Sequence, residues 1–359
     1  MGSIWGNRLK ISVFGESHGA GIGVIIDGLP AGIRPDEQAI GNVLARRKPK
    51  RSAYSTTRTE DDIPKVISGL YQGRTNGAPL CAVFENTNVR SDDYSELAGK
   101  PRPGHSDFTA YIKYRGFNDP RGGGHFSGRL TACLVYAGAI CMQVLGEKGI
   151  EIGSHIYSIG SIQDLPFDLD TTPELLKSIK EKDFPVIDDD AGAKMITEIE
   201  HAAREGDSIG GVIECCALGM PAGIGNPMFW GAESVISSIV FSIPAIKGVE
   251  FGRGFELSRM RGSAANDAFT FQGGKVVTKS NNCGGILGGI TNGMPVVFRA
   301  CIKPTASIFN KQDTVDLAAN TDTVIKVKGR HDSCIAPRAA VAVESAAAIA
   351  LLDMMLSNE

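Results

Sequence analysis

The chain lacks the features that mark exported or disulfide-stabilised proteins. Its eight cysteines include no C-x-x-C pair, and most of them lie in apolar runs, where cysteine acts as a small hydrophobic residue. No apolar run of signal-peptide length follows Met1, and Gly6 stands where a myristoylation signal needs serine or threonine. These absences exclude a disulfide framework and a cysteine-based zinc site, and they predict a cytoplasmic protein.

Long hydrophobic runs, aromatic residues and a strong charge of either sign are also scarce. The longest apolar stretch, residues 130–145, is shorter than the roughly 20 residues that span a bilayer, so we expect a buried helix there. The chain has 37 Lys and Arg against 40 Asp and Glu, a net charge of −3, and only two Trp and seven Tyr. This balance argues against a nucleic-acid partner, and the hydrophobic content of 42% predicts a globular protein with a large core.

Glycine, in contrast, is abundant, with 44 residues in a chain of 359. The excess over the usual share of about 7% has no G-X-Y period, which excludes collagen. It predicts many turns and places where the backbone approaches a bound molecule closely. The length fits two ordinary domains, one large domain or one domain built by duplication.

A long internal repeat favours duplication. Residues 15–33 are similar to residues 206–224, at a constant offset of 191 residues and without a gap. Each copy predicts a turn, a β-strand and a Gly-x-Pro-Ala-Gly-Ile turn. A self-match at about half the chain length indicates one domain, residues 1–359, made of two similar halves, roughly 1–180 and 181–359, with a break between residues 160 and 200.

The two copies differ at one informative position. His18 stands where the second copy has Ile209, so the shared scaffold does not need a histidine there. This favours a chemical role for His18. The alternative, a histidine satisfied within its own turn, stays open.

The coarse pattern of secondary structure mixes helices and strands. It predicts helices at residues 35–47, 127–148, 172–182, 191–204, 234–242 and 337–356, and strands at residues 9–14, 66–73, 80–85, 210–217 and 296–302. Residues 75–77 predict a hairpin between the second and third of these strands. Because the strands cluster with hairpin connections, we expect an α+β fold, with the two most apolar helices between layers.

Four of the six histidines lie in short segments rich in glycine and arginine: His18, His105, His125 and His331. Histidine suits proton transfer near neutral pH because its unperturbed pKa is about 6.5. We therefore expect two or more of the four to be acid or base groups. His155 and His201 lie in ordinary strand and helix contexts and are expected to be structural.

Arginines share these segments or lie near them: Arg46, Arg47, Arg102, Arg121, Arg129 and Arg330. Guanidinium groups bind carboxylate and phosphate through paired hydrogen bonds, and consecutive glycines form backbone nests for anions. The ligand is therefore expected to be polyanionic. The basic run at residues 46–51 has three interpretations: a solvated helix end, a nucleic-acid contact, or the rim of a site for a small anion.

Several familiar signatures are absent or incomplete. The chain has no P-loop and no H-E-x-x-H motif, and we expect no metal site. The glycines of residues 19–23 lack the spacing of a dinucleotide fingerprint and lead into a strand. Asp332, beside His331, is the most suggestive carboxylate, although capping of the helix ahead of Pro337 is an equal alternative.

Taken in order, these segments resemble the chorismate synthase family along nearly the whole chain. The matching segments are residues 15–32, 102–105, 121–124, 282–289, 303–305 and 329–332. The first of them is a highly specific signature of that family.

The resemblance implies a carbon–oxygen lyase of the shikimate pathway, at the last common step of aromatic amino-acid biosynthesis. In that reaction 5-enolpyruvylshikimate 3-phosphate loses phosphate and a C6 proton by 1,4-anti-elimination, giving chorismate. Reduced FMN is required without net redox change. The phosphate and two carboxylates of the substrate agree with the polyanionic ligand expected from the arginines.

By the same resemblance, His18 protonates the departing phosphate, His105 protonates reduced flavin at N1, and Asp332 helps flavin N5 act as the base. Flavin contacts carry over to His125, Phe126, Ser127, Pro244, Ala245, Gly288, Lys303, Pro304, Thr305, Ala306, Ser307 and Arg330. Arg47 and Arg129 are expected to bind anionic groups of the substrate or of NADPH. The implied fold is a β-α-β sandwich with internal pseudo-symmetry, and the implied assembly is a homotetramer.

The sequence departs from the family pattern at two places. Ala53 stands where other members have a second arginine, which argues against an NADPH role, and His125-Phe126 stands where many have Arg-Ser. Whether the chain reduces its own FMN or depends on a separate flavin reductase stays open. Residues 47–58 and 305–330 are expected to form lids.

Two other functions compete with this interpretation. A flavin-free phosphate-ester hydrolase would release phosphate without FMN, and it would more naturally carry metal-ligand spacing. A flavoprotein or nucleotide sensor would use its histidines only to grip phosphate. Replacement of His18 separates the cases, because a catalytic histidine controls turnover whereas a binding histidine controls affinity.

Overall fold

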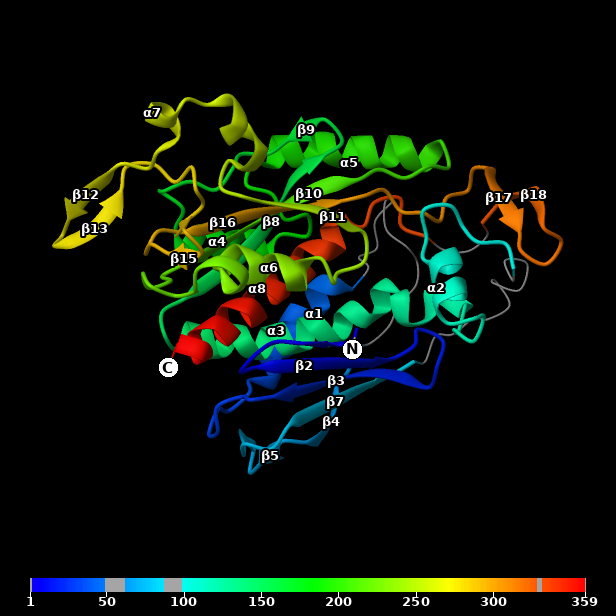
Figure 1. The fold of residues 1–359 in the computed structure, drawn as a ribbon, viewed down its shortest axis with the longest axis horizontal. Helices are drawn as coiled ribbons and strands as arrows, with labels where there is room; N and C mark the ends of the chain where they lie inside the picture. Colours follow the sequence, from blue (N-terminus) through cyan, green and yellow to red (C-terminus); the bar gives the residue numbers. More distant parts are fainter. Residues whose placement is uncertain (1, 49–61, 87–98, 328–330, 359) are drawn as a thin grey trace.

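Two antiparallel sheets enclose a layer of helices. The computed structural model describes residues 2–48, 62–86, 99–327 and 331–358. In Figure 1 one five-stranded sheet lies below the helices and a second five-stranded sheet lies above them. The order of layers is sheet, helices, sheet, which confirms the α+β class and the β-α-β sandwich.

The first sheet is formed by the N-terminal part of the chain. Its strands lie in the order β1 (Ile4–Trp5), β2 (Lys10–Gly15), β3 (Gly21–Asp27), β7 (Leu80–Glu85) and β4 (Lys65–Ser68). Burial alternates along β7, and all four residues of β4 are exposed. The sheet is therefore packed on the helices through one face and leaves the other largely in solvent.

The second sheet is covered on both faces. Its strands lie in the order β11 (Ile246–Phe251), β16 (Val296–Ile302), β10 (Gly211–Leu218), β8 (Glu151–Ile159) and β9 (Ile162–Gln163). Helix α5 (Asp189–Arg204) lies above it in Figure 1, and α4 (Pro173–Glu181) packs against β8. Leu176 and Ile179 of α4 pack on Cys216 and Val297 of the sheet. Burial on this outer face explains why β8 and β10 read as nearly continuous buried strands.

The middle layer consists of α1 (Glu37–Arg47), α3 (Thr131–Gly146), α6 (Ala232–Val240) and α8 (Ala336–Asn358). A Cβ at Gly138 of α3 would lie 2.3 Å from the Cβ of Ser345 in α8, so the close crossing of these two helices requires glycine. The segment Gly128–Gly146 and helix α8 are long and apolar enough to cross a membrane, but 78% and 83% of their most apolar windows are buried. Both are core helices, as expected for the apolar stretch at residues 130–145.

Several predicted boundaries follow from local capping. Asp36 accepts hydrogen bonds from the backbone of Gln38 and Ala39 and begins α1, and Thr172 accepts one from Leu175 and begins α4. The hairpin expected between residues 66–73 and 80–85 is less direct. Strands β4 and β7 pair, but the short strands β5 (Leu70–Tyr71) and β6 (Arg74–Thr75) form a ladder of their own between them.

The remaining elements decorate the sandwich. They are α2 (Asp107–Lys113), α7 (Gly262–Ala265), 3-10 segments at Arg121–Phe126, Gly128–Leu130, Met228–Trp230 and Gly254–Arg259, and three two-stranded ladders. The ladders are β12 (Phe269–Gln272) with β13 (Lys275–Thr278), β14 (Ile286–Leu287) with β15 (Ile290–Thr291) and β17 (Gln312–Asp316) with β18 (Thr321–Ile325). In Figure 1, β12–β13 and β17–β18 project from opposite ends of the molecule.

The two halves share their strand order and one set of hydrogen bonds. The order β1-β2-β3-β7-β4 of the first sheet corresponds to β9-β8-β10-β16-β11 of the second. Thr75 Oγ1 donates to the Pro30 carbonyl and accepts from the Ile33 N–H, at 2.7 and 3.0 Å. Thr291 Oγ1 makes the equivalent bonds to the two residues that match in the repeat, Pro221 and Ile224, at 2.6 and 3.0 Å.

This correspondence supports the duplication that the repeat predicts. Strand β8 begins at Glu151 and belongs to the second sheet, whereas α3 ends at Gly146 and has α8 as its counterpart. We propose that the halves meet at residues 147–150, earlier in the chain than the break predicted near residue 180.

Candidate active site

Three consecutive glycines lie against two of the histidines expected to be catalytic. Gly122, Gly123 and Gly124 have φ angles of 59°, 84° and 54°, in the left-handed region that favours glycine. A Cβ at Gly122 would lie 2.1 Å from Cε1 of His18, and a Cβ at Gly123 would lie 3.2 Å from Cε1 of His105. His18 and His105 are therefore brought together at adjacent residues of one loop.

His18 is buried, with 7% of its surface exposed, and its protonation pattern follows from Ser17. The Ser17 hydroxyl donates to the Gly122 carbonyl at 3.1 Å and lies 3.0 Å from Nδ1 of His18. A hydroxyl has one proton, so its donation to the Gly122 carbonyl leaves Nδ1 of His18 as the donor in the second contact.

His105 is held by an aspartate and an arginine. Its Nδ1 lies 2.6 Å from Oδ1 of Asp107, and Oδ2 of Asp107 accepts from Nε of Arg102 at 2.7 Å. Burial alone would raise the pKa of Asp107, but hydrogen bonds from Arg102 and His105 hold that pKa well below its usual range. The ionised carboxylate of Asp107 therefore accepts a hydrogen bond from Nδ1 of His105.

The segment at residues 303–307 lies beside His105. Arg102 donates to the Ser307 hydroxyl at 3.2 Å, and Lys303 Nζ lies 3.3 Å from the position of a Cβ at Gly104. The Lys303 N–H donates to the Ala245 carbonyl at 3.0 Å. These contacts bring together Ala245, the segment at 303–307 and His105, which the family resemblance places around one flavin.

Two features of this segment suit a bound polar group. The hydroxyl Oγ1 of Thr305 is buried and has no hydrogen-bond partner, which is costly unless a ligand or water satisfies it. Burial lowers the pKa of Lys303, and the nearby charge of Lys247 lowers it further. The environment of Lys303 therefore favours an anion near its amine.

His125, Phe126 and Ser127 have different surroundings. Both ring nitrogens of His125 are engaged, by the Gly15 carbonyl at 2.8 Å and by the Ser3 hydroxyl at 2.9 Å. Phe126 is 38% exposed, and Ser127 accepts a hydrogen bond from the backbone of Arg129. Phe126 can therefore stack on a bound ring, whereas the imidazole of His125 is bound within the protein.

Arg47 and Arg129 converge on one buried carboxylate. Both form ion pairs with Asp62. Burial would raise the pKa of Asp62, but the charges of the two arginines lower it. Arg338 connects this cluster to the third predicted catalytic residue, because it donates to Asp332 at 2.7 Å and to the Arg47 carbonyl at 3.1 Å.

Sequence analysis missed several members of this arrangement. Asp107 lies two residues after His105 in the same segment, so its position was a usable signal. Asp62 and Arg338 had no such signal, because they reach the site only through the tertiary fold. Asn86 was also missed. Its amide holds the 15–19 loop by donating to the carbonyls of Glu16 and Gly19 at 2.9 and 3.0 Å.

Other predicted residues are placed elsewhere or not described. Gly288 lies in the β14–β15 turn, where the next residue accepts from the N–H of Ala232 at the start of α6, while Pro244 and Ala245 follow the other end of that helix. The hydrogen bonds therefore do not bring Gly288 to the 303–307 segment. The ring of His331 lies 6.4 Å from that of Phe309. Ala53, Arg330 and most of the predicted lid at residues 47–58 lie outside the described residues.

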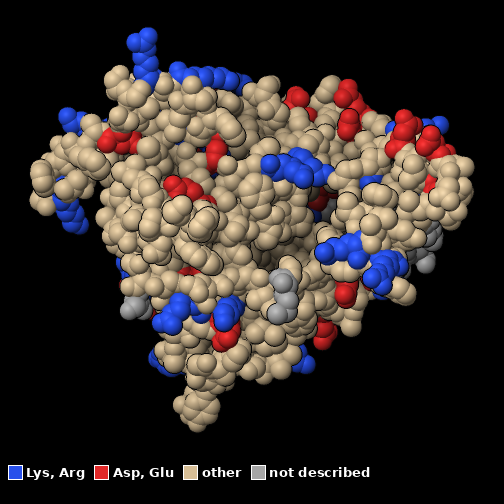
Figure 2. Space-filling model, in the orientation of Figure 1, with Lys and Arg blue, Asp and Glu red and all other residues tan. Residues whose placement is uncertain are grey.

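The surface around these residues is hollowed. Figure 2 shows a depression between α6 and α2, with Lys and Arg side chains above it and to its right. Within the described parts of the chain, no group of three or more His, Cys, Asp and Glu side chains is arranged to hold a metal ion. On the face shown in Figure 2, the depression is therefore bordered by basic side chains.

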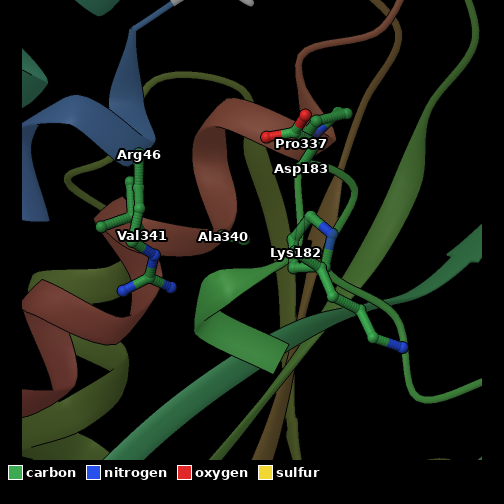
Figure 3. A pocket seen from close by; sticks show the side chains of 7 residues that line it. Arg46, Lys182, Asp183, Pro337, Ala340 and Val341 are labelled. Carbon is green, nitrogen blue, oxygen red and sulfur yellow. The ribbon is translucent and has the colours of Figure 1, made fainter. Parts of the chain in front are cut away.

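A separate small pocket lies between α1, the end of α4 and the start of α8 (Figure 3). Its lining consists of Arg46, Lys182, Asp183, Pro185, Pro337, Ala340 and Val341. Arg46 is bound through two hydrogen bonds of 2.8 Å to the buried carboxylate of Glu344. The predicted site residues do not line this pocket, and its arginine already has a structural partner.

Comparison with known proteins gives consistent results. The family model described as chorismate synthase matches residues 9–356. The chorismate synthase of Dehalococcoides mccartyi is 45% identical over 356 residues, 99% of this chain and 97% of that protein. That of Thermococcus kodakarensis is 46% identical over 351 residues, 98% of this chain and 97% of that protein. A crystal structure of chorismate synthase is similar with a TM-score of 0.76 and 29% identity, over 99% of this chain and 93% of that one.

Proposed function

The chain belongs to the chorismate synthase family, and from that premise we propose that it converts 5-enolpyruvylshikimate 3-phosphate to chorismate. The reaction is a 1,4-anti-elimination of phosphate and the C6 proton, with reduced FMN as cofactor. The observation that carries the proposal is the packing of His18 and His105 against the adjacent glycines 122 and 123. Two histidines with defined donors at Nδ1 are thereby presented to one site.

The residues present fit a flavin. The buried hydroxyl of Thr305 lacks a partner, Lys303 and Ser307 provide further polar groups, and Phe126 offers an exposed ring. Residues 303–307, with Pro244, Ala245, Phe126 and Ser127, would hold the cofactor. When bound, reduced FMN supplies transient electron donation that weakens the C–O bond, and it supplies the base for the C6 proton.

His18 would act as the general acid. Its Nδ1 proton is committed to Ser17, so protonated His18 presents a second proton at Nε2. Transfer of that proton to the departing phosphate neutralises charge as the C–O bond breaks. Ser17 keeps the ring of His18 oriented because its hydroxyl donates a hydrogen bond to the Gly122 carbonyl and accepts one from Nδ1 of His18.

His105 and the arginines would organise the remaining charge. The carboxylate of Asp107 orients the ring of His105 through Nδ1, and Arg102, which binds the same carboxylate, also donates to Ser307. Arg47 and Arg129 would bind the phosphate or a carboxylate of the substrate with paired hydrogen bonds, in exchange for their present ion pairs with Asp62. Asp332 is bound to Arg338, which also donates to the Arg47 carbonyl, so Asp332 lies next to these arginines.

The test is anaerobic phosphate release from 5-enolpyruvylshikimate 3-phosphate, with and without chemically reduced FMN. We expect release that needs reduced FMN and yields chorismate in equal amount. Release without flavin would favour a hydrolase, and FMN binding without any release would favour a sensor. His201, which is 64% exposed on α5, gives a matched control, because His201→Ala should leave the rate unchanged.

The biological setting completes the proposal. A carbon–oxygen lyase of this family with two buried core helices fits a cytoplasmic, soluble enzyme of aromatic amino-acid biosynthesis. We further propose a homotetramer of chains, each a single domain of two similar halves. The electrons for FMN come either from NADPH at the same site or from a separate flavin reductase, and an anaerobic assay with NADPH alone distinguishes them.

A further inference from the structure

His125 joins two segments that are far apart in the sequence. Its Nδ1 lies 2.8 Å from the Gly15 carbonyl, and its Nε2 lies 2.9 Å from the Ser3 hydroxyl. A carbonyl only accepts, so Nδ1 carries a proton. The Ser3 carbonyl accepts in turn from the N–H of Val13 at 3.0 Å, so both partners of the ring are anchored on β2.

The position of His125 matters because β2 leads directly into the loop that carries His18. The same loop is joined to the glycine segment by two more hydrogen bonds, from the Ser17 N–H to the Gly124 carbonyl at 3.2 Å and from the Ser17 hydroxyl to the Gly122 carbonyl at 3.1 Å. The His125 bond to Gly15 therefore acts together with these bonds to hold the loop of His18 against Gly122. A shift of the loop relative to the glycines would move the His18 ring.

We propose that His125 is a positioning residue for His18 rather than a flavin contact. It holds the end of β2 against the glycine segment through Nδ1, and Ser3 orients its ring through Nε2. The proposal rests on the proposed function, in which His18 is the general acid. Its distinguishing consequence is that loss of His125 lowers turnover and leaves flavin affinity in place.

Two replacements of His125 separate the hydrogen bond from the shape of the ring. His125→Phe keeps a planar ring without an N–H, whereas His125→Asn offers an amide N–H near the position of Nδ1. We expect His125→Phe to lower kcat about 10- to 100-fold, the size expected for a misplacement of roughly 1 Å, with the Kd for FMN changed less than about threefold. We expect His125→Asn to recover kcat to within about threefold of the parent chain. Ser3→Ala removes only the partner of Nε2, so it should lower kcat less than His125→Phe, which also removes the bond to Gly15.

Kinetics can overturn the proposal in two ways. A tenfold or larger loss of FMN affinity in both His125 variants, with kcat restored at saturating flavin, would show a flavin contact. An unchanged kcat in His125→Phe would show that His18 needs no such support.

A spectroscopic measurement keeps the test independent of activity. The chain has six histidines, so labelling of histidine Cε1 gives six ring signals, and His18→Asn assigns the signal of His18. We expect His125→Phe to shift the His18 signal and the pH at which it titrates, while His201→Ala leaves both unchanged. This measurement does not depend on whether the parent chain makes chorismate. An unshifted His18 signal in His125→Phe would reject the proposal, and a shifted signal would support it.

Discussion

The equivalent loops of the two halves, residues 15–19 and 206–210, share a scaffold and differ in chemistry. Each is followed by a strand and by a turn that a threonine, Thr75 or Thr291, holds with the same two hydrogen bonds. In the first loop His18 packs on Gly122. In the second loop Ile209 occupies the equivalent position and packs on Gly160.

The second loop nevertheless supports the same site. The Ser208 hydroxyl donates to the Thr305 carbonyl at 2.8 Å, and the Ile209 N–H donates to the Ser333 carbonyl at 2.9 Å. It therefore fixes the 303–307 segment and the chain next to Asp332. The comparison shows that duplication preserved the turn, while the proposed acid was placed in one copy and a purely structural contact in the other.

The two sheets show a second contrast, at equivalent positions where three residues lie side by side on neighbouring strands. In the second sheet Glu214 lies between His155 and Arg299, where the first sheet has Gly23 between Phe14 and Val83. His155 and Glu214 are completely buried beneath the outer helices, whereas Phe14 is 39% exposed. Polar side chains that are buried in a sheet covered on both faces must hydrogen-bond to one another, since water cannot reach them.

The largest effect is expected from the difference between His18 and Ile209. His18→Ala removes the proposed acid and should slow phosphate release about 10²- to 10⁴-fold, measured anaerobically with reduced FMN. Ile209→Val trims the equivalent residue and should stay within about threefold. Equal losses in the two variants would mean that both loops act only as structural supports.

The next largest effect is expected from the buried row of the second sheet. Burial alone would lower the pKa of His155, but its hydrogen bonds to Asp164 and Glu214 raise it above the usual value. A raised pKa in the folded state stabilises the protein fully below the unfolded pKa of about 6.5, and this contribution is lost as the pH rises through the folded pKa. His155→Gln should therefore cost about 3–5 kcal/mol of unfolding free energy at pH 6, and less at high pH.

Denaturant unfolding at pH 6 and pH 9 measures this difference, with Phe14→Ala as the counterpart from the first sheet. Phe14 is partly exposed and uncharged, so its loss should cost about 1–2 kcal/mol at both pH values. A cost for His155→Gln that does not depend on pH would show that the pKa of His155 is the same in the folded and the unfolded protein.

An intermediate effect is expected at Gly122, the glycine that lies against His18 in the first half of the chain. A Cβ at Gly122 would meet His18 at 2.1 Å on a backbone with φ of +59°, whereas one at Gly128 would meet nothing within 4 Å. Gly122→Ala should lower kcat about 10- to 100-fold with FMN affinity retained, and Gly128→Ala should be near the parent. Parent-like turnover of Gly122→Ala would show that the close contact between Gly122 and His18 does not control the reaction.

The smallest effect tests the shared scaffold itself. Thr75→Val and Thr291→Val each remove a donor to a proline carbonyl and an acceptor for an isoleucine N–H. Each should lower the unfolding free energy by about 1–3 kcal/mol, by similar amounts, and the two losses should add because the turns are separate. Markedly unequal losses in chemical denaturation would show that the halves are alike in geometry but not in stability.

Much of the fold was predictable because the signals are local. The start of α1 was visible at residues 35–37, where Asp36 caps the helix, and its end in the basic residues of its last turn. Long apolar runs predicted α3 and α8. The histidine and arginine segments were likewise visible as short motifs. What the pattern missed is non-local, because Asp62 and Arg338 meet Arg47 from other parts of the chain.

By itself the sequence determined the class of fold, the duplication and the family, because turn residues, burial periodicity and the repeat at 191 residues are properties of neighbours along the chain. Only the tertiary structure decided which groups form hydrogen bonds with the histidines. Ser17 sets the donor atom of His18, Asp107 sets that of His105, and the nitrogens of His125 are taken by Ser3 and Gly15. The physical reason is that hydrogen-bond direction and burial depend on which surfaces meet when the two sheets close over the helices.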